Sequence, residues 1–371
     1  MDVAKLSPRL LLGPGPSPVS PRILQALARP TLGHLDPQFL GILDEVNDGL
    51  RELFGTTNQT TFPVSGTGSA GMEAAMVNLL EPGDTAIVGV KGVFGTRLAE
   101  MARRLGAQVV EVEGEWGRPL DPERLIEAHN DHPGARLVAL VHAETSTGVR
   151  QPLSAVGRHL RNSDTLFVVD AVTSLGGMEV GVDDVGIDVC YAGTQKCLGV
   201  PPGLAPITFS SRALDRIRNR ESPVASWYLD VTLIAGYLGS ERRYHHTAPI
   251  NLIYALHEAL AEVRDEGLGP RFARHARVGG RLQEELVERG FGLFTQPPEA
   301  RLPQLTAATL PDGREEGPLR ARLLEDHGIE VGGGLGPGKG KLWRIGLMGH
   351  GARDSSVDRL LEAVDVLMED A

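Results

Sequence analysis

Seven short apolar runs alternate with helix-like segments between residues 60 and 210, and this alternation constrains the fold more than any other feature of the chain. The runs are TTFPV (60–64), DTAIVGV (84–90), AQVVEVE (107–113), ARLVALVHAE (135–144), TLFVVDAVTS (165–174), IDVCYAGT (187–194) and LAPITFS (204–210). They are almost continuously apolar, which is typical of parallel strands that are covered on both faces. The alternation therefore predicts an α/β fold, a three-layer sandwich around a mostly parallel sheet.

Helix signals occupy the stretches between these runs. GMEAAMVNLL (71–80) has a helical pattern that stops at EPGD, and TRLAEMARRLGA (96–107) follows the second run. In DPERLIEAHND, Asp121 is an expected N-cap and Pro122 suits the first helical position, where a missing N–H costs nothing. These segments predict helices that cross between neighbouring strands.

The sequence changes character from about residue 249. A long helical stretch (250–290) is broken around GLGP and is followed by three shorter strand candidates: LTAATLP (305–311), IEVG (329–332) and KLWRIGL (341–347). A closing segment, SSVDRLLEAVDVLMED, has the i, i+3, i+4, i+7 apolar spacing of an amphipathic helix. We expect an N-terminal arm (1–15), a large domain (16–265) and a smaller C-terminal α+β domain (266–371).

Charge and cysteine content restrict the partners and the compartment. The 371 residues carry a formal net charge of -11, which argues against nucleic acid or an anionic membrane as a general partner. Cys190 and Cys197 are the only cysteines and form no CxxC pattern, so we expect a reducing, cytoplasmic compartment. The apolar run near the N-terminus is too short for a signal peptide, and no run is long enough to predict a membrane span.

Two glycine-rich segments are candidates for phosphate binding. VSGTGSAGMEAA (64–75) lies between a strand and a helix, where backbone N–H groups and the helix dipole favour an anion; a tight turn that binds nothing is the alternative. GGGLGPGKGK (332–341) has the glycine spacing of a nucleotide-binding loop. However, Gly340 replaces the magnesium-binding hydroxyl and the loop precedes a strand, so we reject an NTPase. No GxGxxG supports a dinucleotide-binding dehydrogenase.

Three strand ends carry polar residues that would meet in one crevice, because ligands of open parallel sheets bind outside the carboxyl ends of the strands. Thr145 follows one strand, Asp170 ends the next and Lys196 follows CYAGTQ. Taken alone, Asp170 is equally well explained as a turn carboxylate, and Lys196 as a solvated loop lysine. Together with the SGTGS turn, however, they match pyridoxal phosphate, which needs a Schiff-base lysine, an acidic partner for its pyridinium and a phosphate cup.

At this point the chain resembles a known family. DAVTSLGG contains Asp170 and GTQKCLGVPPGLAPITFS contains Lys196; LLLGPGPSPVSPRIL, SGTGSAGMEAAMVNLLEPGD, ETSTGVRQPL, YHHTAPINLIYALHEAL and GGLGPGKGKLWRIGLMG occur with them. In this order the segments resemble the class V (fold type I) pyridoxal-phosphate aminotransferases, above all the alanine–glyoxylate and serine–pyruvate aminotransferases. The resemblance extends over nearly the whole chain.

The resemblance implies roles for the matching residues. Lys196 would bind the cofactor aldehyde and shuttle the α-proton, Asp170 would pair with the pyridinium, and Arg344 would clamp the substrate carboxylate. The remaining implied cofactor contacts are Thr67, Gly68, Ser69 and Gln195 at the phosphate, Thr145 near the phenolic oxygen, Val172 and Phe94 on the ring faces, and Tyr244 and Thr247 at the phosphate of a neighbouring subunit. Many relatives have tryptophan where this chain has Phe94. Gly13 and Gly15 would lie near the substrate, as would Thr145, and the enzyme would be a homodimer with shared sites.

The implied reaction is a ping-pong transfer of an amino group from a small α-amino acid, alanine or serine, to a 2-oxo acid such as glyoxylate or pyruvate. The alternatives are a serine–glyoxylate or aminophosphonate transaminase, a cysteine desulfurase-like lyase, and a binding protein without catalysis. We expect no metal site, because no glutamate or cysteine completes a ligand set with His245 and His246. We expect Cys197 to be a buried structural thiol and His34 to have a structural role.

Overall fold

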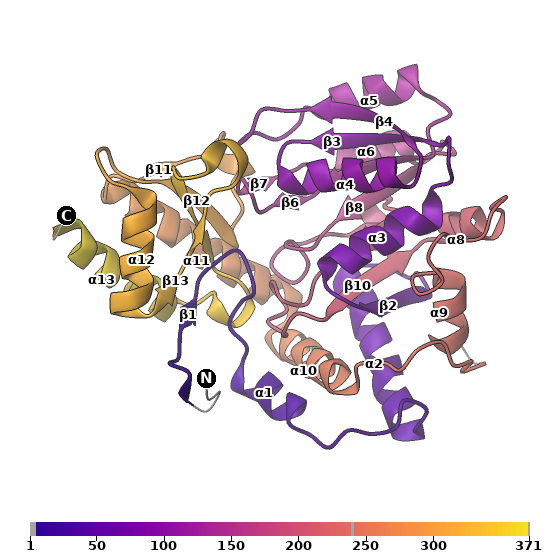
Figure 1. Cartoon of the computed structure of the whole chain (residues 1–371), viewed down its shortest axis with the longest axis horizontal. Helices are drawn as coiled ribbons and strands as arrows, with labels where there is room; N and C mark the ends of the chain where they lie inside the picture. The colour runs from indigo at the N-terminus through magenta and orange to yellow at the C-terminus, as the bar shows by residue number, and fades with distance from the viewer. Residues whose placement is uncertain (1–4, 239–240, 370–371) are drawn as a thin grey trace.

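The computed structural model describes residues 5–238 and 241–369, and its largest element is a seven-stranded sheet in the order β2-β10-β9-β8-β5-β3-β4 (Figure 1). The strands are β2 (Thr60–Ser65), β3 (Thr85–Val90), β4 (Gln108–Glu113), β5 (Leu137–Val141), β8 (Leu166–Asp170), β9 (Val189–Tyr191) and β10 (Leu204–Phe209). Each of the seven predicted runs coincides with one of them, and β2 extends one residue beyond its run. Only β10 runs against its neighbours, β2 and β9, so the mostly parallel sheet is confirmed.

Helices cover both faces of this sheet. They are α1 (Pro21–Leu27), α2 (Pro37–Phe54), α3 (Gly68–Leu79), α4 (Val93–Arg104), α5 (Pro122–Asp131), α6 (Ser154–Leu160), α7 (Val182–Val185), α8 (Ser211–Arg218), α9 (Val231–Leu238) and α10 (Ile250–Glu266). Alternate residues of one strand enter opposite cores: Val138 packs with α2 and α10, while Leu137 packs with α3 and α4. The predicted three-layer sandwich is therefore confirmed.

Two helices of the sandwich begin in the same way. The Asp121 side chain accepts a hydrogen bond from the backbone N–H of Glu123 at 3.1 Å and Pro122 follows it, which confirms the predicted N-cap of α5. Asp36 caps α2 in the same manner through Gln38 N–H, at 2.8 Å, and precedes Pro37. The sequence carried this second signal too, although we had not predicted a helix there.

The C-terminal part has its own small sheet and core. Its sheet has the order β11-β12-β15-β14, in which neighbouring strands are antiparallel, and helices pack against it, as expected for an α+β unit (Figure 1). Its elements are α11 (Leu268–Glu288), β11 (Gly292–Leu293), β12 (Leu305–Thr309), α12 (Glu316–His327), β13 (Ile329–Glu330), β14 (Gly332–Gly333), β15 (Leu342–Gly346) and α13 (Asp354–Glu369), with 3-10 turns at Pro298–Ala300, Gly336–Gly338 and Gly349–Gly351.

The N-terminal segment joins the two parts. Strand β1 (Leu10–Leu11) pairs in parallel with β13, beside which it lies in Figure 1, and Ser17 N–H then donates to the Gln195 carbonyl of the large part at 2.9 Å. The domain limits at residues 15/16 and 265/266 stay predictions. Within residues 5–238 and 241–369, no helix combines the length and the apolar character that crossing a bilayer requires.

Candidate active site

Asp170 lies at the carboxyl end of β8, opposite Val141 of β5 and Tyr191 of β9 in the strand register. It is 2% exposed, and protein donors reach both of its oxygens: Val172 N–H donates to Oδ1 at 2.9 Å and the Tyr191 hydroxyl donates to Oδ2 at 3.0 Å. Burial raises the pKa of Asp170 to about 6, and the two hydrogen bonds act in the opposite direction. A cation placed against this carboxyl group would hold it ionised.

Lys196 follows β9 and is also buried, with 9% exposure. Burial lowers the pKa of its amine to about 8, and the nearby Arg344 guanidinium acts in the same direction. The ammonium donates to the carbonyl of Pro14, and a Cβ added to Gly15 would lie only 2.8 Å from Nζ. The N-terminal segment therefore lies directly on the amine, and a substantial fraction of that amine is neutral near pH 8.

The backbone around Lys196 is held from two sides. The Ser17 hydroxyl donates to the Lys196 carbonyl at 2.6 Å. Arg271, which is 5% exposed, donates through Nη2 to the Cys197 carbonyl at 2.7 Å and through Nε to the Gly176 carbonyl at 2.9 Å. These hydrogen bonds hold the backbone of the loop, and they therefore fix the position of the Lys196 backbone from which its side chain extends.

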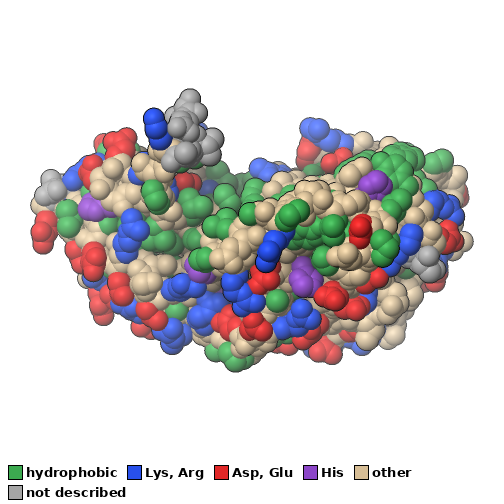
Figure 2. Space-filling view, turned by 90° about the horizontal axis from the view of Figure 1, so that it is seen from below, with side chains coloured by type: hydrophobic (Ala, Val, Ile, Leu, Met, Phe, Trp, Pro, Cys, Tyr) green, Lys and Arg blue, Asp and Glu red, His purple; other side chains and the backbone are tan. Residues whose placement is uncertain are grey.

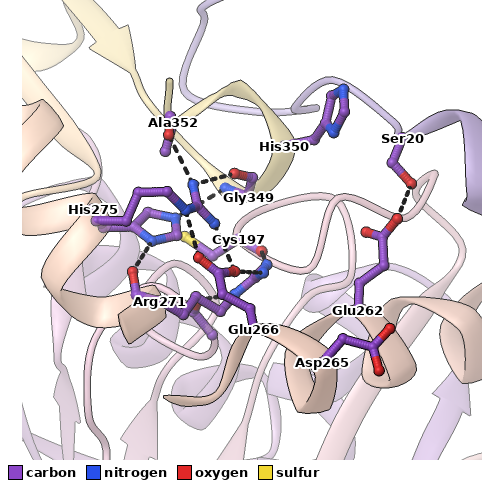
Figure 3. A network of polar contacts seen from close by, with 12 residues as sticks. Ser20, Cys197, Glu262, Asp265, Glu266, Arg271, His275, Gly349, His350 and Ala352 are labelled. Atoms are coloured by element: carbon purple, nitrogen blue, oxygen red, sulfur yellow. Dashed lines mark hydrogen bonds and ion pairs between the residues drawn. The ribbon is translucent and has the colours of Figure 1, made fainter. Parts of the chain in front are cut away.

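Arg271 belongs to a polar network at the junction of α10 and α11 (Figure 3). Glu266 accepts hydrogen bonds from Arg271 at 2.9 Å and from Arg274 at 2.6 Å. Arg274 also donates to the Gly349 carbonyl at 3.0 Å, and Gly349 N–H donates to Nε2 of the buried His275 at 3.0 Å. The network thus ties the Lys196 loop to the turn at Gly349–Gly351 in the C-terminal part.

The first turn of α3 lies against Val172, two residues after Asp170, and against the backbone of Ala192. Thr67 is its N-cap but makes no capping hydrogen bond with its side chain, and both Thr67 and Ser69 are exposed. Gly68 is buried so closely against Val172 that a Cβ there would lie 2.9 Å from Cγ2. The Gln195 Oε1 atom is buried without a hydrogen-bond partner. A helix N-terminus, two hydroxyl groups and an unsatisfied amide therefore form a polar cup.

Arg344 extends from β15 of the C-terminal part towards Thr145 and Lys196 of the large part. Its Nε donates to the Gly333 carbonyl at 2.7 Å and its Nη1 donates to the Thr145 carbonyl at 3.3 Å. Burial lowers the pKa of Arg344, whereas the charge of Glu144 raises it. Among residues 5–238 and 241–369, no acceptor hydrogen-bonds to Nη2, so this nitrogen can donate to a ligand.

Phe94 N–H is bound by a glutamate that our sequence interpretation missed. Glu144, in β6 (Ala143–Glu144), is fully buried and accepts a hydrogen bond from Phe94 N–H at 3.2 Å. Ser146 Oγ accepts another from Val93 N–H at 3.0 Å, so both residues cap α4. β6 forms a hairpin with β7 (Val149–Arg150), and Glu144 is the last residue of β6 as Asp170 is the last residue of β8. A carboxylate at the end of an apolar run was the sequence feature that could have identified Glu144.

Two predicted contacts lie apart from the rest. Tyr244 is 57% exposed, its hydroxyl lies 3.4 Å from Thr247 Oγ1, and its ring lies 5.1 Å from that of His34. In the part of the chain that the structure describes, neither side chain contacts the residues around Lys196. The neighbouring His246 bonds to Ser65 Oγ at 2.8 Å, which fixes the segment to the strand before the polar cup.

A second buried lysine was also missed by the sequence interpretation. Lys91 directly follows β3, is 1% exposed and donates to the Val141 carbonyl at 2.9 Å. Burial lowers its pKa to about 8, while Glu144 and Asp170 act in the opposite direction. Lys91 therefore lies close to the carboxyl groups of Glu144 and Asp170.

The surroundings of Cys197, His245 and His246 indicate structural roles for these residues. Burial raises the pKa of Cys197 to about 12, so this thiol is a poor sulfur nucleophile, and a desulfurase gains no support from it. His245 and His246 bond to each other through their Nδ1 atoms at 2.7 Å. The described residues include no group of three or more histidine, cysteine, aspartate or glutamate side chains arranged to bind a metal ion.

Comparison with known proteins agrees with these features. Residues 22–344 match the family model for class-V aminotransferases. The chain is 39% identical to the (S)-ureidoglycine–glyoxylate transaminase of Bacillus subtilis, over 97% of this chain and 90% of that protein. It is also 39% identical to the rat alanine–glyoxylate aminotransferase, over 96% of this chain and 86% of the other. The crystal structure of alanine–glyoxylate aminotransferase from Nostoc sp. superposes with a TM-score of 0.97 at 48% identity, covering 99% and 97% of the two chains.

The chain therefore belongs to the class-V aminotransferases, and the predicted family is confirmed. It is a transaminase that depends on pyridoxal 5'-phosphate and that acts on an amino acid and a 2-oxo acid. The residues present fit this cofactor: Lys196 is a buried amine, Asp170 is a buried carboxyl group, and the side chain of Gln195 has a buried amide oxygen without a partner. When bound, the cofactor supplies an electron sink that acidifies the α-C–H bond of the amino acid.

Proposed function

We propose that this transaminase moves the amino group of a small α-amino acid, alanine or serine, to glyoxylate or pyruvate in a ping-pong reaction. The observation that carries the proposal is the position of Arg344. Its positive charge lowers the pKa of Lys196, and its Nη2 can donate to a ligand. A planar guanidinium is suited to a carboxylate, and both amino acids and 2-oxo acids carry one. The two relatives compared above share glyoxylate in their names, which supports it as the acceptor.

In this proposal three residues perform the proton transfers and orient the substrate. Lys196 would hold the cofactor aldehyde, and its amine would accept the proton from the α-carbon of the substrate; a pKa near 8 supports that task. Asp170 would favour a proton on the ring nitrogen through its negative charge. Arg344 fixes the substrate carboxylate, which orients the α-C–H bond towards the amine.

The other predicted residues bind and orient. Thr67, Gly68, Ser69 and Gln195 would hold the phosphate group, supported by the polar cup around the first turn of α3. Val172 and Phe94 would contact the two faces of the ring, and Thr145 would lie near its phenolic oxygen. Gly15 would leave room for the substrate, since a Cβ there meets the lysine amine.

We further propose a homodimer in which Tyr244 and Thr247 bind the phosphate group of the partner's cofactor. Their exposure supports this, as do large apolar side chains left exposed: Leu24, Leu35, Trp227 and Tyr228. Figure 2 shows hydrophobic side chains gathered in a band on one face of the molecule. Because both cysteines are free and buried, we also propose a reducing, cytoplasmic compartment.

Hybrid dimers test the shared site. K196A and a Tyr244→Ala/Thr247→Ala variant would each be inactive or nearly so alone. If the two residues serve the partner's site, a mixed dimer has one site with both defects and one intact site, and activity returns on mixing. If they serve their own subunit, both sites stay defective and mixing restores nothing.

The substrate proposal is tested by a half-reaction screen. Each amino acid is mixed with the cofactor-loaded enzyme without an acceptor, and the change in cofactor absorbance is followed. We expect alanine and serine to react fastest, and glyoxylate or pyruvate to reverse the change. Faster conversion of a long or charged amino acid, or release of sulfide from cysteine, would contradict the proposed substrates.

A further inference from the structure

We propose that Tyr191 is a positioning residue that keeps Asp170 oriented and ionised through its hydroxyl group. The inference rests on the proposed role of Asp170 as the partner of the cofactor's ring nitrogen. It concerns a residue that lies within the strand before Lys196 and that our sequence interpretation left without a role.

The geometry makes the contact between the two side chains direct. Tyr191 ends β9 opposite Asp170 in the register of β8 and β9, it is fully buried, and its hydroxyl donates to Asp170 Oδ2 at 3.0 Å. Val172 N–H already donates to Oδ1. With a donor on each oxygen, the carboxylate cannot rotate without breaking a hydrogen bond, and its remaining lone pairs point in fixed directions.

Tyr191 differs from the charged groups around Asp170. The titratable groups that act on Asp170 from the neighbouring strand ends are Tyr191, Cys190, Lys196, Glu144 and Lys91, and the backbone N–H of His142 donates to the Asp170 carbonyl. Glu144 opposes the ionised form of Asp170, and Lys196 supports it only while its amine carries a charge. Burial raises the pKa of Tyr191 well above its ordinary value, so its hydroxyl keeps its proton. Tyr191 is thus a donor that persists while the charge of Lys196 changes.

A hydrogen bond that favours the charged form of a carboxyl group lowers its pKa by about one unit or more. Tyr191→Phe removes only the hydroxyl oxygen and leaves the ring in place. We therefore expect the pKa of Asp170 to rise by about one unit in this variant. The cofactor dissociation constant would then increase about fivefold at pH 6 and match the wild type at pH 9.

The experiment measures cofactor binding to the cofactor-free protein from pH 6 to pH 9 by absorbance. Tyr254→Phe is the matched control, because Tyr254 is a buried tyrosine of α10 whose hydroxyl accepts from Leu32 N–H at 3.2 Å, away from Asp170. Its binding curve should follow the wild type. The decisive arm is Tyr191→Phe in an Asp170→Asn background, where no carboxylate remains to titrate and the pH-dependent effect should disappear.

Three results would overturn the inference: Tyr191→Phe binds like the wild type at every pH, it weakens binding equally from pH 6 to pH 9, or its pH dependence persists with Asp170→Asn. A different result would defeat the proposed site itself. If Asp170→Asn alone binds the cofactor as tightly as the wild type and reacts as fast with amino acids, Asp170 is not the partner of the ring nitrogen.

Discussion

Two buried lysines at the ends of strands invite a direct comparison. Lys91 follows β3 and Lys196 follows the end of β9; they are 1% and 9% exposed, and burial lowers the pKa of each to about 8. Their neighbours differ. Lys91 donates to a strand carbonyl beneath the site, whereas Lys196 lies between the N-terminal segment and Arg344 of the C-terminal part. Burial and a lowered pKa are therefore shared, and the two lysines differ in having Arg344 beside Lys196 and a strand carbonyl beside Lys91.

The largest expected effect separates the two lysines by activity. We predict that Lys196→Ala lowers kcat by about 10⁴-fold or more, because the variant loses both the covalent attachment of the cofactor and the base for the α-proton. Lys91→Met should lose less than about tenfold, since it removes only one of the charges that act on Asp170. The assay is transamination of alanine with glyoxylate at pH 8. Equal losses in the two variants would contradict the comparison.

The next effect tests what surrounds Lys196. We predict that Arg344→Lys raises KM for the amino acid and lowers kcat/KM by about 10²-fold, because an ammonium keeps the charge but loses the planar fork that binds a carboxylate. Binding of the cofactor itself should change little. The measurement is the steady-state rate with alanine, together with a cofactor titration of the same variant. An unchanged KM would exclude Arg344 as the carboxylate ligand.

The smallest effect concerns stability in the cofactor-free protein. A lysine with a folded-state pKa of about 8 and an ordinary value of 10.5 binds fewer protons when folded, so its contribution to the free energy of unfolding rises with pH between those values. We predict that the wild type gains about 2 kcal/mol relative to Lys91→Met between pH 8 and pH 10.

Urea unfolding at the two pH values measures this difference. The buried thiols of Cys190 and Cys197 have raised pKa values and oppose the gain, but they are present in both proteins and cancel in the comparison. A difference between wild type and Lys91→Met that stays constant from pH 8 to pH 10 would show that Lys91 titrates normally.

Much of the fold could be predicted from sequence because local patterns determine it. The apolar runs predicted all seven strands of the large sheet, and Asp121 with Pro122 predicted the start of α5. The reversed direction of β10 could not be predicted, since an apolar strand such as LAPITFS has no sequence feature that distinguishes a parallel from an antiparallel neighbour. The two-residue strand β1 depends on pairing with β13, more than 300 residues away.

The candidate site likewise has residues that could be proposed from the sequence and residues that could not. Asp170, Lys196 and the first turn of α3 could be proposed from the sequence because polar residues at the ends of parallel strands share one edge of the sheet. Tyr191 was not, because its hydroxyl acquires a role only through the register that sets it opposite Asp170. The structure also places Tyr244 and Thr247 apart from Lys196, and their predicted role depends on a second copy of the chain.

The central claim, that Lys196 and not Lys91 holds the cofactor, has a direct chemical test. The chain has five lysines, Lys5, Lys91, Lys196, Lys339 and Lys341, so one peptide map distinguishes them all. Borohydride treatment of the loaded enzyme reduces the bond between the cofactor aldehyde and its lysine to a stable amine. We predict that mass spectrometry finds the phosphopyridoxyl group on the Lys196 peptide alone; the group on Lys91, or on no single lysine, would contradict the account.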